Sequence, residues 1–242
     1  MPVLAAYDKF NPMICNRLQA VLGRIEAACT RSGRSAKEIE LVLVSKQVDA
    51  GLIQEAYQTG IRDFGENRVQ EWLAKRETLP RDIRWHMIGH LQTNKAKHVV
   101  GGVALIHSCD RLDLALELQK QAEKKGLTVQ TLVQVNTSGE ETKYGLSPAE
   151  VKKTVSEMCR FDRVKLGGLM TIGPFTSEES EIRKSFRTLR EIRAELQNDF
   201  PSVDWHYLSM GMTNDFELAI EEGANCLRLG TAVFGARSKV EN

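Results

Sequence analysis

The sequence lacks several features of membrane, exported and disulfide-rich proteins. No apolar run approaches the roughly 18 residues that a membrane-spanning helix needs. Residues 1–10 lack the basic flank and apolar stretch of a signal peptide, so we expect none. The 5 cysteines are an odd number, lie far apart and include no C-x-x-C pair. This pattern argues against a disulfide scaffold or a zinc ribbon, and it favours a reducing compartment, which we take to be the cytoplasm.

An excess of one charge is also missing. The chain has 33 Lys and Arg against 32 Asp and Glu, which gives a formal charge of +1. This balance argues against a general nucleic-acid binder, which usually carries a basic stripe. The 242 residues include no low-complexity segment and no Pro/Gly/Ser-rich linker, so residues 1–242 are expected to form one α/β domain with a core of its own.

Short apolar runs recur along the chain, and each has the length and β-branched or aromatic content of a buried strand. We interpret eight of them as strands: Leu41–Ser45, Ile61–Gly65, Trp85–Gly89, Val103–Ser108, Thr131–Val135, Val164–Met170, Val203–Leu208 and Cys226–Gly230.

Helical patterns lie between these runs. Leu112, Ala115, Leu116, Leu118 and Ala122 have the spacing of one helical face, and so do Ile182, Phe186, Leu189, Ile192 and Leu196. The segment 147–150, Ser-Pro-Ala-Glu, is a capping box with proline at the first helical position. A helix over Pro12–Cys29, within an extension of about 35 residues that packs on the barrel, is expected before the first strand.

Strands that alternate with helices imply parallel strands joined by crossovers. Eight such units in a chain of this length are typical of a (β/α)8 barrel of the TIM type. An open doubly wound sheet is the alternative. It would need a Gly-rich turn after the first strand, and residues 44–47 contain no glycine. In a barrel the loops that follow the strands form the site.

Lys46 follows the first predicted strand. Partial desolvation at such a position lowers the pKa of an amine and favours Schiff-base chemistry. A single lysine at a strand end more often reaches solvent or pairs with a carboxylate. His86 and His90 are four residues apart, but their segment is predicted as a strand and a loop. A helical metal pair is therefore not expected, and no metal site is predicted.

The turns after the last two predicted strands contain Ser209, Gly211, Gly230 and Thr231. Glycine lets the backbone approach a ligand, hydroxyls donate, and the helix N-termini that follow present unpaired N–H groups. Barrels often bind phosphate at these two turns. A lysine together with two phosphate-binding turns fits a phosphorylated aldehyde, either pyridoxal 5′-phosphate (PLP) or the substrate of a sugar-phosphate aldolase.

Seven segments in order along the chain resemble the YggS/PROSC family of PLP-binding proteins, also called PLP homeostasis proteins. The segments are Val44–Lys46, Phe64–Glu71, His86–Lys95, Lys143–Leu146, Gly168–Met170, Ser209–Asp215 and Arg228–Gly235.

The resemblance implies a barrel like the N-terminal domain of alanine racemases, the fold-type III PLP architecture. It implies that Lys46 is the lysine of the covalent aldimine. It implies phosphate contacts from the turn that includes Ser209, Gly211 and Met212, and from the turn of Gly230 and Thr231. It also implies that Arg228 lies near the pyridine nitrogen and that Asn67 lies beside the ring.

The residues also bear on catalysis. An arginine beside the ring nitrogen has no proton to lend as an acid and disfavours a pyridinium, which leaves a weak electron sink. Alanine racemases work with such an arginine by using a tyrosine from a second domain, which is expected to be missing here. The remaining tyrosines near strand ends are Tyr144 and Tyr207.

We therefore predict a non-catalytic PLP carrier in vitamin B6 and amino-acid homeostasis. The partners expected are PLP and possible recipient apo-enzymes, with neither nucleic acid nor membrane, and the state expected is a monomer. A small racemase-like PLP enzyme that uses Tyr144 or water is the alternative, and a PLP-free aldolase that uses Lys46 is a third hypothesis.

Overall fold

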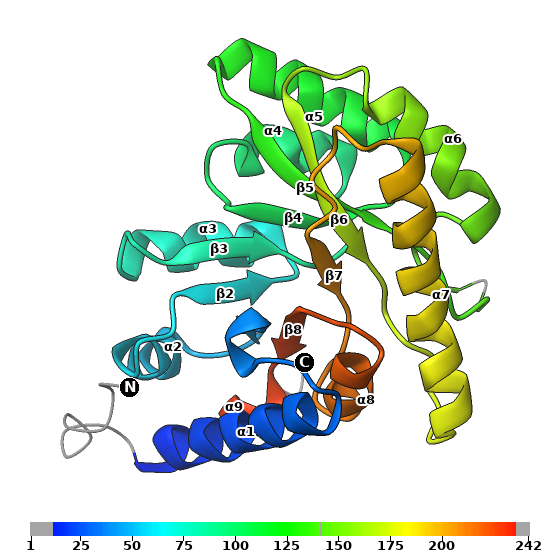
Figure 1. Cartoon of the computed structure of the whole chain (residues 1–242). Coiled ribbons are helices and arrows are strands. Elements are labelled where there is room, and N and C mark those ends of the chain that lie inside the picture. The colour runs from blue at the N-terminus through cyan, green and yellow to red at the C-terminus, as the bar shows by residue number, and fades with distance from the viewer. Residues whose placement is uncertain (1–11, 141, 236–242) are drawn as a thin grey trace.

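The computed structural model describes residues 12–140 and 142–235. Within these ranges eight parallel strands close into a barrel in sequence order (Figure 1). The strands are β1 (Glu40–Val44), β2 (Asp63–Glu66), β3 (Arg84–Met87), β4 (Leu105–Cys109), β5 (Val129–Gln134), β6 (Val164–Met170), β7 (Tyr207–Ser209) and β8 (Cys226–Leu229). The predicted TIM-type barrel is confirmed, and each predicted strand overlaps an observed one.

The register of the strands decides which loops are neighbours. Val44 of β1 lies opposite Gly65 of β2, and Leu43 lies opposite Leu229 of β8. Ser209 of β7 pairs with β8 at Cys226. The loops that leave β7, β8, β1 and β2 therefore meet along one side of the barrel mouth.

Helices surround the barrel (Figure 1). The α-helices are α1 (Pro12–Arg31), α2 (Ala50–Gln58), α3 (Val69–Thr78), α4 (Ala96–Val99), α5 (Leu112–Lys125), α6 (Pro148–Met158), α7 (Glu179–Asp199), α8 (Phe216–Glu221) and α9 (Thr231–Phe234), and the short 3-10 helices are η2 (Ala36–Glu38) and η3 (Thr93–Lys95). At the start of α6 the predicted capping box is present, with the Glu150 carboxylate accepting from the Ser147 N–H at 3.0 Å.

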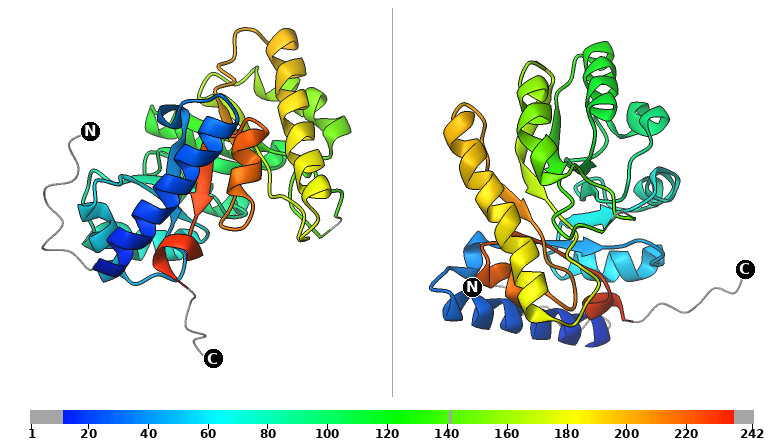
Figure 2. Two further views of the ribbon diagram at one scale, coloured as in Figure 1. Left: turned by 60° about the horizontal axis from the view of Figure 1, so that its bottom comes forward. Right: turned by 90° about the vertical axis from the view of Figure 1, so that its right-hand side faces the viewer.

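Helix α1 covers the outside of the barrel beside α8 and α9 (Figure 2). Its Arg24 and Arg31 pair with Glu217 of α8 at 2.7 and 2.9 Å. The predicted N-terminal helix therefore exists and packs where expected, although it continues to Arg31. The first 11 residues of the predicted extension lie outside the described residues.

One predicted helical face is partly wrong. Helix α5 buries Leu114, Ala115, Leu118 and Ala122, whereas Leu116 is 50% exposed. Leu116 is two residues from Leu118, about 160° around a helix, so the two cannot share the face that meets the barrel. Leu114 occupies that face instead.

The barrel interior holds few apolar side chains. Leu105, Leu132 and Met170 form a small interior cluster, separate from the large core between the strands and the helices. Among the described residues, no helix combines the length and apolar character that crossing a membrane requires. The interior also holds polar side chains, among them His107, Ser209 and Arg228, whose hydrogen bonds are described with the candidate site.

Candidate functional site

The predicted site residues gather on one side of the barrel mouth. Lys46 follows β1 and Asn67 follows β2, while the turns at 210–213 and 230–231 follow β7 and β8. Because these four strands are consecutive around the barrel, the amine and the two glycine-containing turns face the same space.

Lys46 lies in a tight turn that is itself unusual. The preceding Ser45 is fully buried, and its carbonyl accepts from the Val48 N–H at 3.0 Å. Gln47 has a φ of +57°, which makes it the one non-glycine residue with a positive φ in the described chain. Side chains rarely adopt this conformation without support from their surroundings. Lys46 itself is half-buried, and its position is set by this turn.

A cluster of charged side chains from β2 and α3 supports that turn. The ammonium group of Lys75 donates to the Ser45 carbonyl at 2.7 Å, to Glu66 at 2.8 Å and to Glu71 at 2.7 Å. The Glu71 carboxylate also accepts from the backbone N–H of Gln47 at 2.5 Å. We call Glu66, Glu71 and Lys75 the turn brace. Burial raises the pKa of Glu66, although Lys75 and Ser45 act in the opposite direction.

Asn67 is positioned by a close backbone approach. A Cβ atom added to Gly89 would lie 2.5 Å from the Asn67 carbonyl oxygen and 2.7 Å from its Cα. Only glycine fits at such a distance. Gly89 thus brings the end of β3 against the backbone of Asn67.

The turn after β7 contains Gly211, Met212 and Thr213, three consecutive residues near the barrel mouth. Gly211 has a φ of +95°, and an added Cβ would lie 2.7 Å from the Ala219 Cβ. The Met212 N–H donates to Asp215 at 2.5 Å. The Thr213 hydroxyl accepts from the Ala232 N–H at 3.3 Å, which joins this turn to the start of α9.

The turn after β8 faces the same opening. Gly230 is buried, whereas Thr231 is exposed and its hydroxyl lies 3.4 Å from that of Thr213. The two turns thus place two hydroxyls and the starts of α8 and α9 together. Hydroxyls and helix N-termini are the groups that bind phosphate.

Arg228 lies inside the barrel and is 3% exposed. Its guanidinium donates to the Ser209 hydroxyl at 2.6 Å and to the Thr171 carbonyl at 2.7 Å. Burial lowers the pKa of Arg228 from its usual value. Ser209 is fully buried, and its hydroxyl bonds to Arg228; its contact with a phosphate stays a prediction.

The Ser209 hydroxyl begins a line of hydrogen bonds that crosses the barrel interior. It lies 2.8 Å from Nδ1 of His107, and Nε2 of His107 lies 2.9 Å from Nδ1 of His86. Nε2 of His86 lies 3.1 Å from the Asp63 carboxylate. We call Asp63, His86, His107 and Ser209 the interior relay. His107 is not among the predicted site residues, although a histidine within an apolar strand is a signal that could have identified it.

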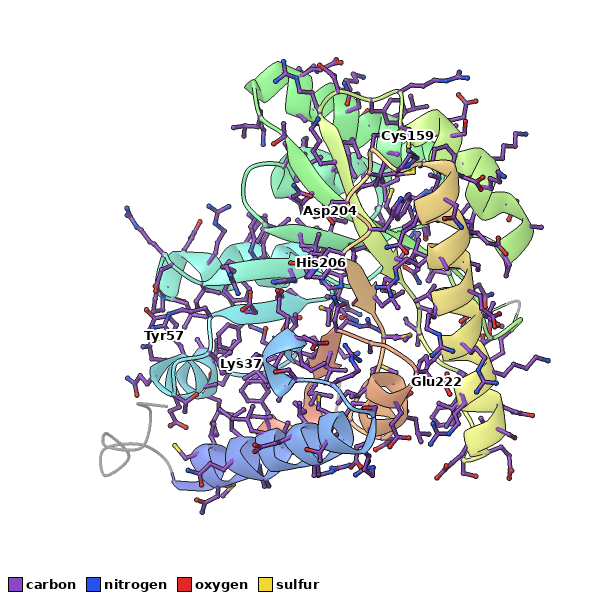
Figure 3. The ribbon with its side chains drawn as sticks, viewed as in Figure 1. Lys37, Tyr57, Cys159, Asp204, His206 and Glu222 are labelled. Carbon is purple, nitrogen blue, oxygen red and sulfur yellow. The ribbon has the colours of Figure 1, made fainter. Side chains whose placement is uncertain are left out.

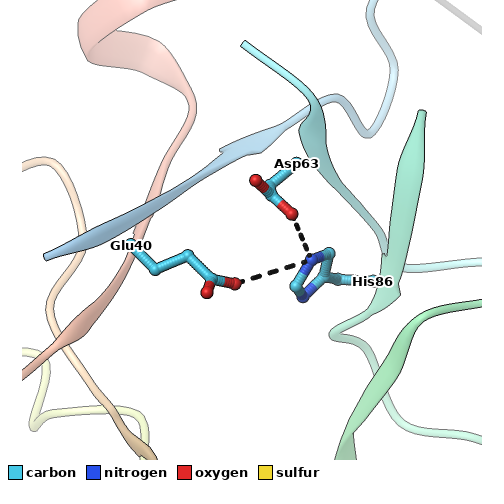
Figure 4. Close-up of side chains that lie close together, drawn as sticks. All are labelled: Glu40, Asp63 and His86. Atoms are coloured by element: carbon cyan, nitrogen blue, oxygen red, sulfur yellow. Dashed lines mark hydrogen bonds and ion pairs between the residues drawn. The ribbon is translucent and has the colours of Figure 1, made fainter. Parts of the chain in front are cut away.

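The relay ends in an ion-pair network at the amino-terminal end of the barrel (Figure 4). There one ligand atom from each of Glu40, Asp63 and His86 lies within 4.8 Å of the others, a spacing that a metal ion could bridge. However, Arg84 pairs with Asp63 and donates to both of its carboxylate oxygens. We therefore describe this cluster as an ion-pair network.

A cavity of about 860 Å³ opens beside this network. It is lined by strand starts and by Cys159, Asp204 and His206 (Figure 3). It lies at the end of the barrel opposite Lys46 and is not the predicted cofactor site.

The two tyrosines considered for acid–base chemistry lie in different places. Tyr207 donates to Glu40 at 3.2 Å, at the amino-terminal end of the barrel. Tyr144 is 58% exposed and stacks on His90, with ring centroids 3.9 Å apart. His90 in turn lies 2.8 Å from Asp110, so His86 and His90 have separate partners.

The chain matches the profile of an alanine racemase domain and is similar to proteins named as pyridoxal phosphate homeostasis proteins. The family profile of the alanine racemase N-terminal domain matches residues 18–238. A pyridoxal phosphate homeostasis protein from Aquifex aeolicus is 48% identical over 92% of this chain and 98% of its own length. A protein of the same name from Escherichia coli is 38% identical over 93% and 97%.

Solved structures are also similar. PipY of Synechococcus elongatus, in its structure with PLP bound, has a TM-score of 0.80 at 36% identity, over 92% of this chain and 100% of that one. An alanine racemase of Clostridium difficile has a TM-score of 0.75 at 12% identity and shares the fold. This chain covers 61% of the racemase.

Proposed function

Because the chain belongs to the alanine racemase N-terminal domain family, we propose that it binds PLP covalently on Lys46 and serves PLP homeostasis. The observation that carries this proposal is the convergence of Lys46 with the two anion-binding turns on neighbouring strands. The PLP-bound structure of PipY and the names of the homeostasis proteins support it.

The residues of the mouth fit the chemical groups of PLP. Lys46 supplies the amine for the aldehyde, and the turns that contain Gly211, Met212, Gly230 and Thr231 supply the Thr231 hydroxyl and the start of α9 for the phosphate. The buried guanidinium of Arg228 is a donor for the pyridine nitrogen, and Asn67 follows β2, the strand that pairs with the strand before Lys46. When bound, PLP supplies an aldehyde that reacts with amines and an aromatic ring that withdraws electrons.

We assign the chain a carrier role rather than catalysis. Arg228 only donates hydrogen bonds and cannot lend a proton as an acid near neutral pH. Tyr144, one of the two candidate second bases in the racemase alternative beside water, is exposed and stacked on His90. The curated relatives are named as homeostasis proteins. We propose apo-enzymes as the recipients of PLP and a monomer as the functional unit.

The 5 cysteines are all free. Free thiols persist in a reducing compartment, which supports a cytoplasmic location.

Two measurements on purified protein test the function. PLP held as an imine on an amine absorbs at about 420 nm. We expect this band for the wild type and its loss in Lys46→Ala. We also expect no exchange of the α-proton of L-alanine in deuterated water. Sustained exchange would contradict the carrier role. Its loss in Tyr144→Phe would identify Tyr144 as the second base, and its persistence in that variant would indicate water.

A further inference from the structure

We propose that the interior relay positions the Arg228 guanidinium for the cofactor, so that Asp63 at one end of the barrel influences the site at the other. The inference rests on the proposed function for its effect on the cofactor. The relay itself follows from the contacts of the described side chains. The other three members, Asp63, His86 and His107, are not among the residues predicted to contact PLP.

The chemistry of Arg228 and Asp63, which lie at the two ends of this line of contacts, decides which atom donates in each hydrogen bond of the relay. A guanidinium only donates, so Ser209 accepts from Arg228. Burial would raise the pKa of Asp63, but hydrogen bonds from His86 and Arg84 outweigh it and lower the pKa below its usual value. Asp63 is therefore an ionised acceptor, and Nε2 of His86 carries the proton that it accepts.

One arrangement of protons then satisfies every contact when both imidazoles are neutral. Nε2–H of His107 donates to Nδ1 of His86, and the Ser209 hydroxyl donates to Nδ1 of His107. Burial lowers the pKa of His107 well below its usual value, and the charge of Arg228 acts in the same direction. His107 accordingly stays neutral, as this arrangement requires.

Arg228 needs such support because its surroundings are unusual for a buried charge. The guanidinium donates hydrogen bonds to two uncharged groups, the Ser209 hydroxyl and the backbone carbonyl of Thr171, and Asp215 acts on it through its charge. Neither partner pairs with the guanidinium in the two-pronged manner of a carboxylate. The direction of its N–H groups therefore depends on where the lone pairs of Ser209 point, which the relay decides.

The relay runs along the neighbouring strands β2, β3 and β4 and then crosses the barrel from β4 to β7, which are not neighbours. His107 is on β4 and Ser209 is on β7, and they are 102 residues apart in sequence. Asp63, at the other end, lies beside Glu40 and Arg84. Asp63 and Arg228 are at opposite ends of this line of hydrogen bonds, so a change at Asp63 would reach the hydrogen bonds of Arg228 through the relay.

Two substitutions separate a positioning role from a structural one. Asp63→Asn removes the charged acceptor at the distal end. His107→Asn keeps an acceptor near the position of Nδ1 for the Ser209 hydroxyl, whereas His107→Leu removes it. A merely structural role would change stability in all three variants but would leave the spectroscopic signature of the site unchanged.

The first readout uses protein without cofactor. We expect Asp63→Asn and His107→Leu to shift the guanidinium ¹⁵N resonance of Arg228, and His107→Asn to restore it toward the wild type. Asp63→Leu serves as a second distal variant if Asp63→Asn does not fold. An Arg228 resonance that is unchanged in folded distal variants would overturn the relay.

The second readout uses protein loaded with PLP. We expect the distal variants to shift the absorbance maximum and its pH profile and to weaken PLP binding by about two- to thirtyfold, the range of network couplings. Borohydride labelling of Lys46 should persist in them. If the wild type takes up no PLP while the Arg228 resonance still responds, the proposed function fails and the relay stands. If PLP binds and neither readout responds, only the relay fails.

Discussion

The ammonium group of Lys75 lies 2.7 Å from the carbonyl oxygen of Ser45, the residue before Lys46. This contact ties helix α3 to the turn that carries the reactive amine. Glu71 fixes the other side of the same turn through the N–H of Gln47. Glu71 and Lys75 of α3 therefore contribute to the site by holding the backbone on either side of Lys46.

Lys75→Met is expected to destabilise the protein by about 3–5 kcal/mol, because it leaves the buried Glu66 carboxylate without its cation. Lys152→Met is the matched control. Lys152 pairs with Asp199 on the surface with its side chain 69% exposed, and we expect a change within about 0.5 kcal/mol. Urea unfolding of both variants measures the difference. Equal stabilities would contradict the turn brace.

Gly211→Ala is expected to weaken PLP binding about tenfold or more, because the new Cβ meets the Ala219 Cβ at 2.7 Å and must displace the turn. Gly126→Ala is the control. Gly126 also has a positive φ, +64°, but nothing lies within 4 Å of an added Cβ. Titration with PLP followed by absorbance should show normal affinity for the control. Weak binding in both variants would mean that Gly211 has no special role.

Thr231→Val and Ser209→Ala should separate the phosphate contact from the Arg228 contact. Thr231→Val is expected to weaken binding of PLP by about 1–3 kcal/mol, the value of a charge-assisted hydrogen bond, and to leave binding of unphosphorylated pyridoxal unchanged. Ser209→Ala should weaken both ligands, because its hydroxyl holds Arg228. If Ser209→Ala weakened binding of PLP but not of unphosphorylated pyridoxal, Ser209 would instead contact the phosphate.

His107 makes stability depend on pH. Burial holds its pKa in the folded protein well below 6.5, so below about pH 6.5 the unfolded chain takes up a proton that the folded protein does not. Stability is therefore lost as the pH falls, by up to about 1.4 kcal/mol per pH unit from this group. His107→Asn should remove this part of the slope. Urea unfolding at several pH values checks it, and an unchanged slope would show that His107 is protonated when folded.

The barrel could be predicted from the sequence because each buried strand is a short apolar run with a helix after it. The run Val164–Met170 matches β6 at both ends. The run Val203–Leu208 is less accurate because β7 begins only at Tyr207. Trp205 is buried by packing outside the strand and bonds to the Phe200 carbonyl. Burial alone cannot distinguish these two environments.

The mouth of the site could be predicted because barrel topology places the residues after each strand together. The interior could not. Ser209 belongs to a glycine-containing turn in sequence, but its side chain points inward to Arg228 and His107. His107 and Lys75 carry no local pattern that names their partners, because those partners lie on other strands and helices. Such contacts follow from the closed barrel rather than from spacing along the chain.

The central claim is that Lys46 carries the cofactor. Purified protein that contains PLP is treated with borohydride, digested and analysed by mass spectrometry, with Lys75 and Lys143 as internal comparisons. The account predicts a phosphopyridoxyl group on Lys46 and unmodified Lys75 and Lys143. An unmodified Lys46 in material shown to contain PLP would contradict it.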